Sequence, residues 1–526
     1  MDADRLYNMP IQVVSLEKEA SGILLLVKGL RNYSTPAGRL PWGVLERIIA
    51  MGASKRDLIS ASHVCRRWRD ILTSSPHLWT EFQCKNAALT LQHLTRSEPA
   101  PVNVIADSRA DVRAVTGLRS ATDRIRSLTL RLRPFDLLEV FGELVTPAPA
   151  LEHLEVSIIP ESGDGPTFRP SIPQTFLGGS APTLKSLHLD EINTRLQFSE
   201  FPALTRLTLV TNTRIFDISE LFQLLTSAQL LEELSVQFSG PTTPIPGSQG
   251  VVQLPRMRKA SFSNTTGEFP TRLLSFLGMP SVEEIKLHIN LFGEDKRTMR
   301  DFLPPQHRNS PHLSKADNLE LDFTSPSCKV KFSGPGVVVS IQVSRGDNRG
   351  QDDLFRSRWL NSLEPISVAG VKGLTLRSYY PTKSFCQLPV LELMDGVQSL
   401  VVERCSSSAV IEALSPPKRG SVLFPHLESL TLRPATGSAT VFPHLTDMAR
   451  ARAQEGFPLS KVSLDQCITF PRSDIDSLKR HVSCVQLKTR VNPHSRKPVE
   501  APSRAIATVR IPFVSPSSCR SFTPLF

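Results

Sequence analysis

The stretch FPALTRLTLVTN, residues 201–212, contains the pattern that decides the fold of this 526-residue chain. Leu204, Leu207 and Leu209 follow a Leu-x-x-Leu-x-Leu spacing, and the last two alternate with polar residues as in a strand with one buried face. The phrase FPHLESLTL at 424–432 repeats both the spacing and the aromatic-Pro lead-in that turns the chain into the strand. The recurrence predicts a repeated strand unit.

The same spacing returns ten times along the chain, at intervals that mostly fall between 20 and 34 residues. The copies begin at Ile125, Leu151, Leu184, Leu204, Leu231, Val282, Val371, Val397, Leu427 and Leu459. The pattern is similar to the leucine-rich-repeat signature, which implies a strand at each Leu-x-Leu and a helix or irregular turn between strands. No single repeat buries its own apolar edge, so neighbours must stack. We therefore expect an α/β fold in which residues 120–485 form an irregular leucine-rich-repeat solenoid, with parallel strands on the concave face and helices or turns outside.

Four copies extend to the full template, with a polar or thiol side chain three residues after the last apolar position: Asn212, Asn290, Cys405 and Cys467. A side chain at that position can hydrogen-bond the backbone between neighbouring coils. We interpret these two cysteines as structural rungs of the array and not as nucleophiles.

The widest gap in the series precedes Val371. Lys329–Phe332 and Val337–Val343 flank the turn sequence Ser-Gly-Pro-Gly, a pattern that predicts a β-hairpin. An amphipathic helix is then expected around Phe355, Trp359, Leu360 and Leu363. We interpret the whole segment as an elaborated repeat and not as a separate domain.

A second informative stretch is LPWGVLERIIAMGASKRDLISASHVCRRWRDILTSSPHLWTEF, residues 40–82. Apolar residues at 44, 45, 48 and 49 recur with the period of one helix face. Ser54 and Asp57 resemble a capping box, and Ser75-Pro76 is an N-cap candidate followed by Pro at the first helical position. Three or four short helices in about 43 residues make a bundle too small to be comfortably stable alone, so it should rest on a neighbour or a partner.

This stretch resembles the F-box motif, particularly as seen in large fungal F-box families. The resemblance is carried by Leu40-Pro41, by the VCRRWR sequence at 64–69 and by the SPHLW sequence at 75–79. F-boxes dock on the small Skp adaptor of cullin–RING (SCF) ubiquitin ligases. The resemblance implies apolar adaptor contacts from Leu40, Pro41, Val44, Leu45 and Ile48, whereas Val64, Cys65 and Trp68 would hold the helices together and line part of the same surface. The chain departs from the family where Trp42 and Gly43 replace the usual Pro or polar residue and Glu.

The resemblance implies a non-catalytic substrate receptor that holds a target protein near a ubiquitin ligase, with target-binding residues that the sequence does not identify. One alternative is an interaction scaffold whose degenerate F-box no longer docks, a reading that Trp42-Gly43 favours. The other is a basic nucleic-acid-binding protein, because the formal net charge is +11. No GxSxG, GxxxxGK[ST], HExxH or strand-linked GxGxxG motif nominates an enzyme site.

Composition and charge complete the domain expectations. The eight cysteines form no CxxC pair, so we expect no metal, no cofactor and a reduced, intracellular chain in the cytoplasm or nucleus. No apolar run is long enough for a membrane span. Residues 1–39 match nothing recognisable, and residues 83–119 are expected to connect the helical module at 40–82 to the array. Residues 486–526 form a Pro/Ser-rich tail, expected to be disordered; from Arg490 onward it holds six basic residues and one acid, which argues against a nucleic-acid surface on the folded part.

Overall fold

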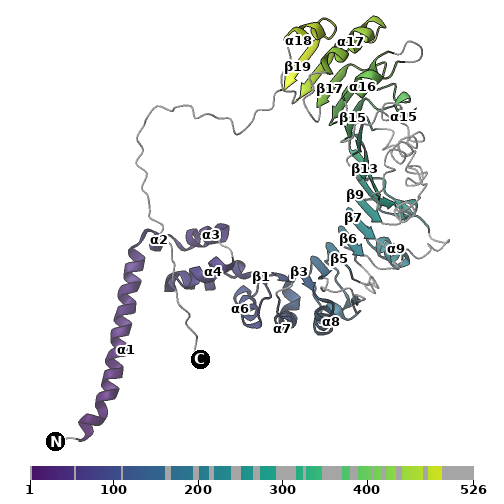
Figure 1. The fold of residues 1–526 in the computed structure, drawn as a ribbon. Helices are drawn as coiled ribbons and strands as arrows, with labels where there is room; N and C mark the ends of the chain where they lie inside the picture. Colours follow the sequence, from purple (N-terminus) through teal and green to yellow (C-terminus); the bar gives the residue numbers. More distant parts are fainter. Residues whose placement is uncertain are drawn as a thin grey trace, which may run out of the picture.

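The structure is a computed structural model that describes residues 3–52, 55–107, 110–159, 168–192, 201–211, 218–238, 250–264, 273–291, 316–323, 327–345, 370–378, 389–404, 407–416, 422–433, 441–465 and 472–488. It is a mixed α/β arrangement with a helical N-terminal region and one large, mostly parallel sheet, as the sequence predicts at this level. The sheet bends into an arc with strands on its inner side and helices on its outer side (Figure 1).

The N-terminal region is helical up to Trp79. Its elements are α1 (Ala3–Ser34), α2 (Pro36–Arg39), α3 (Trp42–Gly52), α4 (Lys55–Ser62), α5 (Arg66–Thr73) and the 3₁₀ turn η1 (Pro76–Trp79). Within the described residues, none of the helices combines the length and apolarity that crossing a bilayer would require.

The main sheet contains 17 of the described strands. In chain order they are β1 (Glu81–Gln83), β2 (Val102–Ala106), β3 (Ile125–Leu132), β4 (His153–Ile158), β5 (Ser186–Asp190), β6 (Arg206–Thr211), β7 (Glu233–Phe238), β9 (Lys259–Asn264), β11 (Glu284–Leu291), β12 (Asn318–Phe323), β13 (Ser327–Gly334), β14 (Val337–Arg345), β15 (Gly373–Ser378), β16 (Ser399–Glu403), β17 (Ser429–Arg433), β18 (Lys461–Asp465) and β19 (Cys484–Lys488). A separate parallel pair joins β8 (Val252–Gln253) and β10 (Leu277–Gly278).

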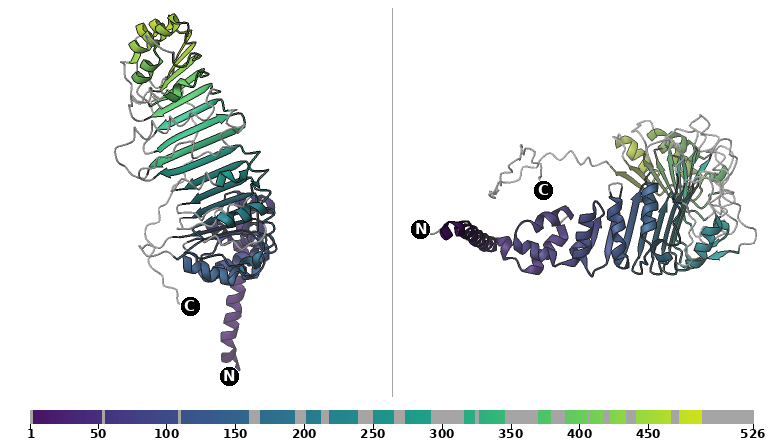
Figure 2. Two further views of the ribbon diagram at one scale, coloured as in Figure 1. Left: turned by 90° about the vertical axis from the view of Figure 1, so that its right-hand side faces the viewer. Right: turned by 90° about the horizontal axis from the view of Figure 1, so that it is seen from below.

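The outer side carries the connecting helices. They are α6 (Ala87–Ser97), α7 (Val112–Thr116), η2 (Gly117–Arg124), α8 (Pro134–Glu143), η3 (Phe176–Gly179), α9 (Ile218–Ser227), α15 (Pro389–Glu392), α16 (Ser407–Leu414), α17 (Val441–Gln454) and α18 (Arg472–Lys479). Neighbouring strands lie about 4.8 Å apart, whereas packed helices need about 8–10 Å. A stack with strands on one side and helices on the other therefore curves, with the strands on the concave side (Figures 1 and 2).

Alternating burial explains why each Leu-x-Leu segment becomes a strand. In β6, Leu207 and Leu209 are at most 2% exposed, whereas Thr208 between them is partly exposed. The register aligns Leu207 with Leu187 of β5 and Leu234 of β7, so equivalent apolar residues stack from strand to strand. One continuous core runs along the sheet between the strands and the outer helices.

The predicted hairpin is confirmed and lies inside the main sheet. β13 pairs antiparallel with β14, and Gly336 in the turn between them has φ +78°, a conformation that glycine adopts without strain. The strand order is β11–β14–β13–β12–β15. After β11 the chain first forms β12, then returns through β13 to β14, which pairs with β11, and finally continues to β15 beside β12. β13 is antiparallel to both of its neighbours, and the other strand pairs of the sheet in the described residues are parallel.

Some strands lie where the sequence pattern predicted none. β1 and β2 pair in parallel, so the sheet begins at Glu81 and the segment 83–119 contributes a strand to it. β9 was missed because Ala260 occupies a position where the pattern requires a large apolar side chain. Of the four template residues, Asn290 lies in β11, whereas Asn212, Cys405 and Cys467 fall outside the described residues. Ser54, the helix expected around 355–363 and residues 489–526 of the tail also fall outside them.

Ser75 differs from its predicted role as an N-cap. Its hydroxyl makes no capping bond to η1, and instead donates to the carbonyl of Ile71 at the end of α5, at 2.8 Å. Pro76 still occupies the first position of the short helix, which is a 3₁₀ turn and not an α-helix. Burial decides the difference: Ser75 is 1% exposed, and the free carbonyls at the end of α5 are the acceptors within reach.

Arg452 in α17 is fully buried and satisfies backbone carbonyls from neighbouring segments. Its Nη1 donates to the carbonyls of Leu414 (3.2 Å) and Leu423 (3.0 Å), and its Nη2 donates to that of Phe424 (2.8 Å). Burial lowers the pKa of this guanidinium to about 10. The side chain therefore ties α17 to the end of α16 and to the turn that leads into β17.

We expect Arg452→Met to destabilise the protein by about 2–4 kcal/mol, because three buried carbonyl acceptors would lose charged donors. Arg450→Met is the matched control, since Arg450 on the same helix is half exposed and, among the described residues, forms an ion pair with Asp447 alone; it should change stability by less than ~0.5 kcal/mol. Urea unfolding followed by circular dichroism measures both. Equal midpoints for the two variants would contradict the role assigned to Arg452.

Candidate functional site

The helical module at 40–82 has its own small core. Six side chains are between 0 and 7% exposed and pack together: Leu45, Ile49, Leu58, Ile71, Leu72 and Trp79. Leu40, Ile59, Ala61, Trp68 and Leu78 are partly buried against them. The module is thus a folded bundle in the structure, as its helical spacing predicts.

Arginines of the VCRRWR sequence tie the bundle together. Arg67 donates to the carbonyl of Leu40, just before α3, and Arg69 Nε donates to the carbonyl of Ser62, at the end of α4, at 3.0 Å. The Arg67 guanidinium also lies over the Tyr33 ring, 5.1 Å from its centroid, which links α5 to the end of α1. Two arginines of this sequence thus have specific partners within the chain.

Trp79 joins the bundle to the sheet. Its indole Nε1 donates to the Leu72 carbonyl at 2.7 Å, while its ring meets His93 at 5.2 Å and the Arg96 guanidinium at 4.3 Å. His93 also stacks on Phe82 of β1, with centroids 5.0 Å apart. Because His93 and Arg96 belong to α6, one buried tryptophan connects α5 with the first outer helix of the array. The expectation that the bundle rests on a neighbour is therefore met within the chain.

The structure divides the apolar residues of α3 between two directions. Leu45 is 2% exposed and Ile49 is 7% exposed, so both point into the bundle. Val44 is 45% exposed, Ile48 is 53% exposed and Met51 is 82% exposed. The last three are spaced i, i+4 and i+7 and form one exposed apolar stripe along the helix. We call Val44, Ile48 and Met51 the α3 stripe.

The predicted adaptor-contact residues are thus not equivalent. Pro41, Val44, Ile48 and Val64 are exposed, whereas Leu40, Cys65 and Trp68 are intermediate. Leu45 is the exception among the predicted contacts, since its side chain is taken up by the bundle core and offers almost no surface to a partner. Met51 is an exposed apolar residue that the sequence reading omitted; its place three residues after Ile48 on the same helix is the signal that could have found it.

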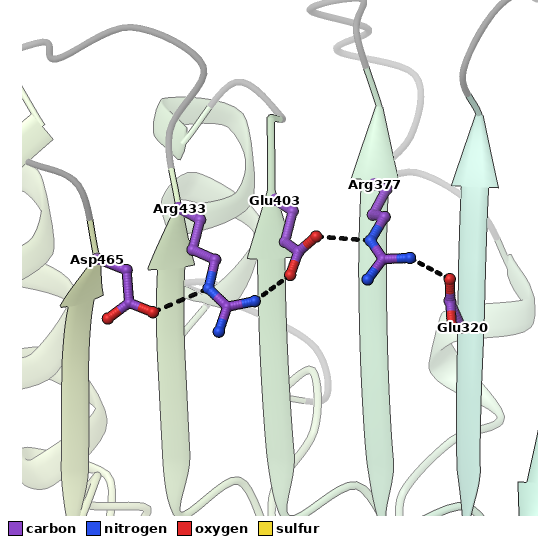
Figure 3. A network of polar contacts seen from close by, with 5 residues as sticks. All are labelled: Glu320, Arg377, Glu403, Arg433 and Asp465. Carbon is purple, nitrogen blue, oxygen red and sulfur yellow. Dashed lines mark hydrogen bonds and ion pairs between the residues drawn. The ribbon is translucent and has the colours of Figure 1, made fainter. Parts of the chain in front are cut away.

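The concave face of the sheet is the second candidate surface. It is formed by the side chains between the buried leucines of each strand, and these are mostly polar or charged. Among them, Glu320, Arg377, Glu403, Arg433 and Asp465 form a continuous chain of ion pairs from β12 through β15, β16 and β17 to β18 (Figure 3). We call these five residues the charge ladder.

The ladder follows from the register of the parallel strands. Arg377 is aligned with Glu403, and Glu403 with Arg433, so opposite charges are direct neighbours. Arg377 Nε donates to Glu403 at 2.6 Å and Arg433 Nε donates to Asp465 at 2.8 Å, while the other guanidinium arms reach Glu320 and Glu403. Each arginine therefore bridges two carboxylates.

The sequence carries a signal for the ladder that its first reading missed. Although the ladder begins at Glu320, the residue directly after the Leu-x-Leu pair alternates in sign along the parallel strands from β12 to β19, through Asp322, Arg377, Glu403, Arg433, Asp465 and Lys488. Parallel, in-register strands place these residues in one row. Only the register, which the sequence does not state, converts this alternation into contacts.

The ion pairs on the concave face lower the pKa of the glutamates that take part in them. Burial alone raises the pKa of Glu403, but the hydrogen bonds and charges of Arg377 and Arg433 outweigh it, so the pKa lies below its ordinary value. A second group involves Arg206, Glu233 and Lys259 at the beginnings of β6, β7 and β9, where Glu233 contacts both bases within 2.9 Å. The hydrogen bonds from Lys259 and Arg206 lower the pKa of Glu233.

Among the described residues, no three His, Cys, Asp or Glu side chains cluster in a way that would hold a metal ion. Cys84 is buried, and burial raises the pKa of its thiol to about 12, although a hydrogen bond with Thr90 partly opposes this; the thiol therefore stays protonated near neutral pH.

Comparison with known proteins identifies the helical bundle. The F-box-like family model matches residues 37–85, which covers α3, α4, α5, η1 and β1. No curated protein matches the chain. The chain therefore carries an F-box-like domain at its helical N-terminal region, in agreement with the resemblance seen at 40–82.

We expect Leu45→Ala to destabilise the F-box-like domain by about 2–4 kcal/mol, because it leaves a cavity in the bundle core. Ile48→Ala should change stability by less than ~0.5 kcal/mol, because about half of the Ile48 surface is already in water and the residue lies outside the bundle core. Urea unfolding monitored by tryptophan fluorescence distinguishes them, since Trp68 and Trp79 lie in this bundle. A larger loss for Ile48→Ala than for Leu45→Ala would show that α3 is oriented differently.

We expect Glu403→Gln to cost about 1–2 kcal/mol near neutral pH, because two charge-assisted hydrogen bonds are weakened on a partly exposed face. Since folding lowers the pKa of Glu403, its stabilisation is complete above the ordinary glutamate pKa and is lost as pH falls through the lower, folded value. The difference between wild type and variant should therefore shrink below about pH 4. Glu139→Gln, at an exposed position on α8, is the control; an unfolding difference for Glu403→Gln that is constant with pH would rule out this account.

Proposed function

We propose that the chain is a substrate-recognition subunit of an SCF-type cullin–RING ubiquitin ligase, acting inside the cell without catalysis of its own. The F-box-like domain would bind a Skp-type adaptor, and the array would bind a target protein. The observation that carries the proposal is the α3 stripe: three exposed apolar side chains lie on a bundle whose core is already complete.

Exposed apolar side chains in one row favour a partner-binding role for α3. A side chain needed for the stability of the bundle would be buried, as Leu45 is, whereas Val44 and Ile48 keep about half of their surface in water. Such a row is typical of a surface that a partner covers. The family match over 37–85 supports a Skp-type adaptor as that partner.

We further propose that residues 81–488 form a leucine-rich-repeat solenoid whose concave face binds the target. In-register parallel strands with stacked leucines, and helices on the outer side, support this reading (Figure 1). A long concave surface offers the area that binding of a folded protein needs. The contacts that Trp79 makes with α5 and α6 would then hold the target at a fixed position relative to the adaptor, which raises the local concentration of target at the ligase.

The test is a pull-down of the purified full-length protein with a Skp-type adaptor. We expect Val44→Asp/Ile48→Asp to weaken binding by at least ~100-fold, because two carboxylates would lose water in an apolar interface. Leu91→Asp is the matched control, since Leu91 is an apolar residue of α6 that is 62% exposed and lies outside the F-box-like domain. It should bind like wild type.

Absence of binding by folded wild-type protein would overturn the receptor proposal and favour an interaction scaffold with a degenerate F-box. Equal loss of binding by Leu91→Asp and by Val44→Asp/Ile48→Asp would show that the loss is not specific to the α3 stripe. Circular dichroism of all variants separates loss of contact from loss of fold.

A further inference from the structure

Helix α1 exposes an unusual amount of apolar surface. Its side chains from residue 13 onward are exposed, and ten large apolar ones are between 50% and 66% exposed: Val13, Val14, Leu16, Ile23, Leu24, Leu25, Leu26, Val27, Leu30 and Tyr33. The helix is held at its C-terminal end, where Tyr33 lies under Arg67. From there it projects away from the rest of the molecule (Figures 1 and 2).

The apolar residues of α1 follow the spacing of a two-helix seam. Counting from residue 13, apolar positions recur alternately three and four residues apart over three heptads: Val13, Leu16, Ala20, Ile23, Val27 and Leu30. This 3.5-residue period is typical of the a and d positions of a coiled coil, and it keeps one face toward a partner helix. Leu24 and Leu26 flank the seam at e and g positions and widen its apolar face, whereas Leu25 lies at position f, opposite the seam.

The charges of α1 favour an antiparallel partner of the same sequence. Glu17 and Glu19 lie in the first half of the segment, where Lys18 occupies position f away from the seam, and Lys28 and Arg31 lie in the second half. Glu17 and Arg31 both occupy e positions, which face each other in an antiparallel pair. A parallel pair would instead set e positions against g positions, so neither glutamate would face a basic residue.

We propose that α1 pairs with α1 of a second copy of this chain, as an antiparallel two-helix coiled coil that makes the protein a homodimer. In the register that sets Ile23 opposite Val27 of the other copy, Ala20, Ile23, Val27 and Leu30 of both copies would leave water together, and Glu17 of each copy would lie beside Arg31 of the other. Because the helix projects from the body, two copies can approach through it without contact between their arrays (Figure 2). The inference does not depend on adaptor binding.

Sedimentation velocity of the full-length protein over a concentration series tests the proposal. We expect wild type to sediment with twice the mass of one chain, and Ile23→Asp to weaken the dimer by at least ~100-fold, because each copy would place a carboxylate in the seam. Leu25→Asp is the matched control: it makes the same change two residues away, at a side chain that is 61% exposed compared with 65% for Ile23. It should leave the dimer intact.

Two outcomes would overturn the proposal. One is a monomeric wild-type protein across the series. The other is equal weakening by Ile23→Asp and Leu25→Asp, which would indicate non-specific association of an apolar helix. Circular dichroism of each variant checks that α1 stays helical when the dimer dissociates.

Charge reversal tests the antiparallel orientation. Glu17→Arg should weaken the dimer by roughly 5-fold, because two opposite-charge pairs become like-charge pairs. Glu17→Arg/Arg31→Glu should restore wild-type dimerisation, since the pairs are then reversed and again complementary. A double variant no stronger than the single one would overturn the antiparallel arrangement.

Discussion

The position of Trp79 determines how the two candidate surfaces are related in space. Its ring is 1% exposed and lies against His93 and Arg96 of α6, while its Nε1 donates to the end of α5. Only Thr80 lies between Trp79 and β1, and β1 is paired to β2. A helical bundle of this size would be marginal by itself, so burial of this one ring both completes its core and fixes its orientation on the sheet.

The alternation of side chains along each strand has an equally direct consequence for the array. Leucines at every second position form the core against the outer helices, so the intervening positions must line the concave face. Side chains at those positions do not pack in the core, so they can be polar or charged. The same alternation that holds the array together thus produces the surface that we propose for target binding.

The elements that could be predicted from sequence are those that use a local and repeated signal. The Leu-x-Leu spacing located most strands, and the Ser-Gly-Pro-Gly turn located the hairpin. β9 could not be predicted, because the small side chain of Ala260 occupies a core position where the Leu-x-Leu pattern requires a large apolar residue. The division of α3 into Leu45 inside and Ile48 outside could not be read either, since adjacent apolar positions form one wide face until the neighbouring helices show which half they cover. The charge ladder required the register, which is a property of paired strands and not of any one of them.

The charge ladder also determines how this end of the concave face acts at a distance. Three carboxylates alternate with two guanidinium groups, so the row has a formal charge of only −1 and most of its field cancels away from the surface. A diffusing partner would feel little long-range attraction or repulsion there, and its encounter rate with this part of the face would depend weakly on ionic strength. Recognition at these strands would then rest on shape and direct hydrogen bonding after contact, while electrostatic steering would have to come from other parts of the molecule.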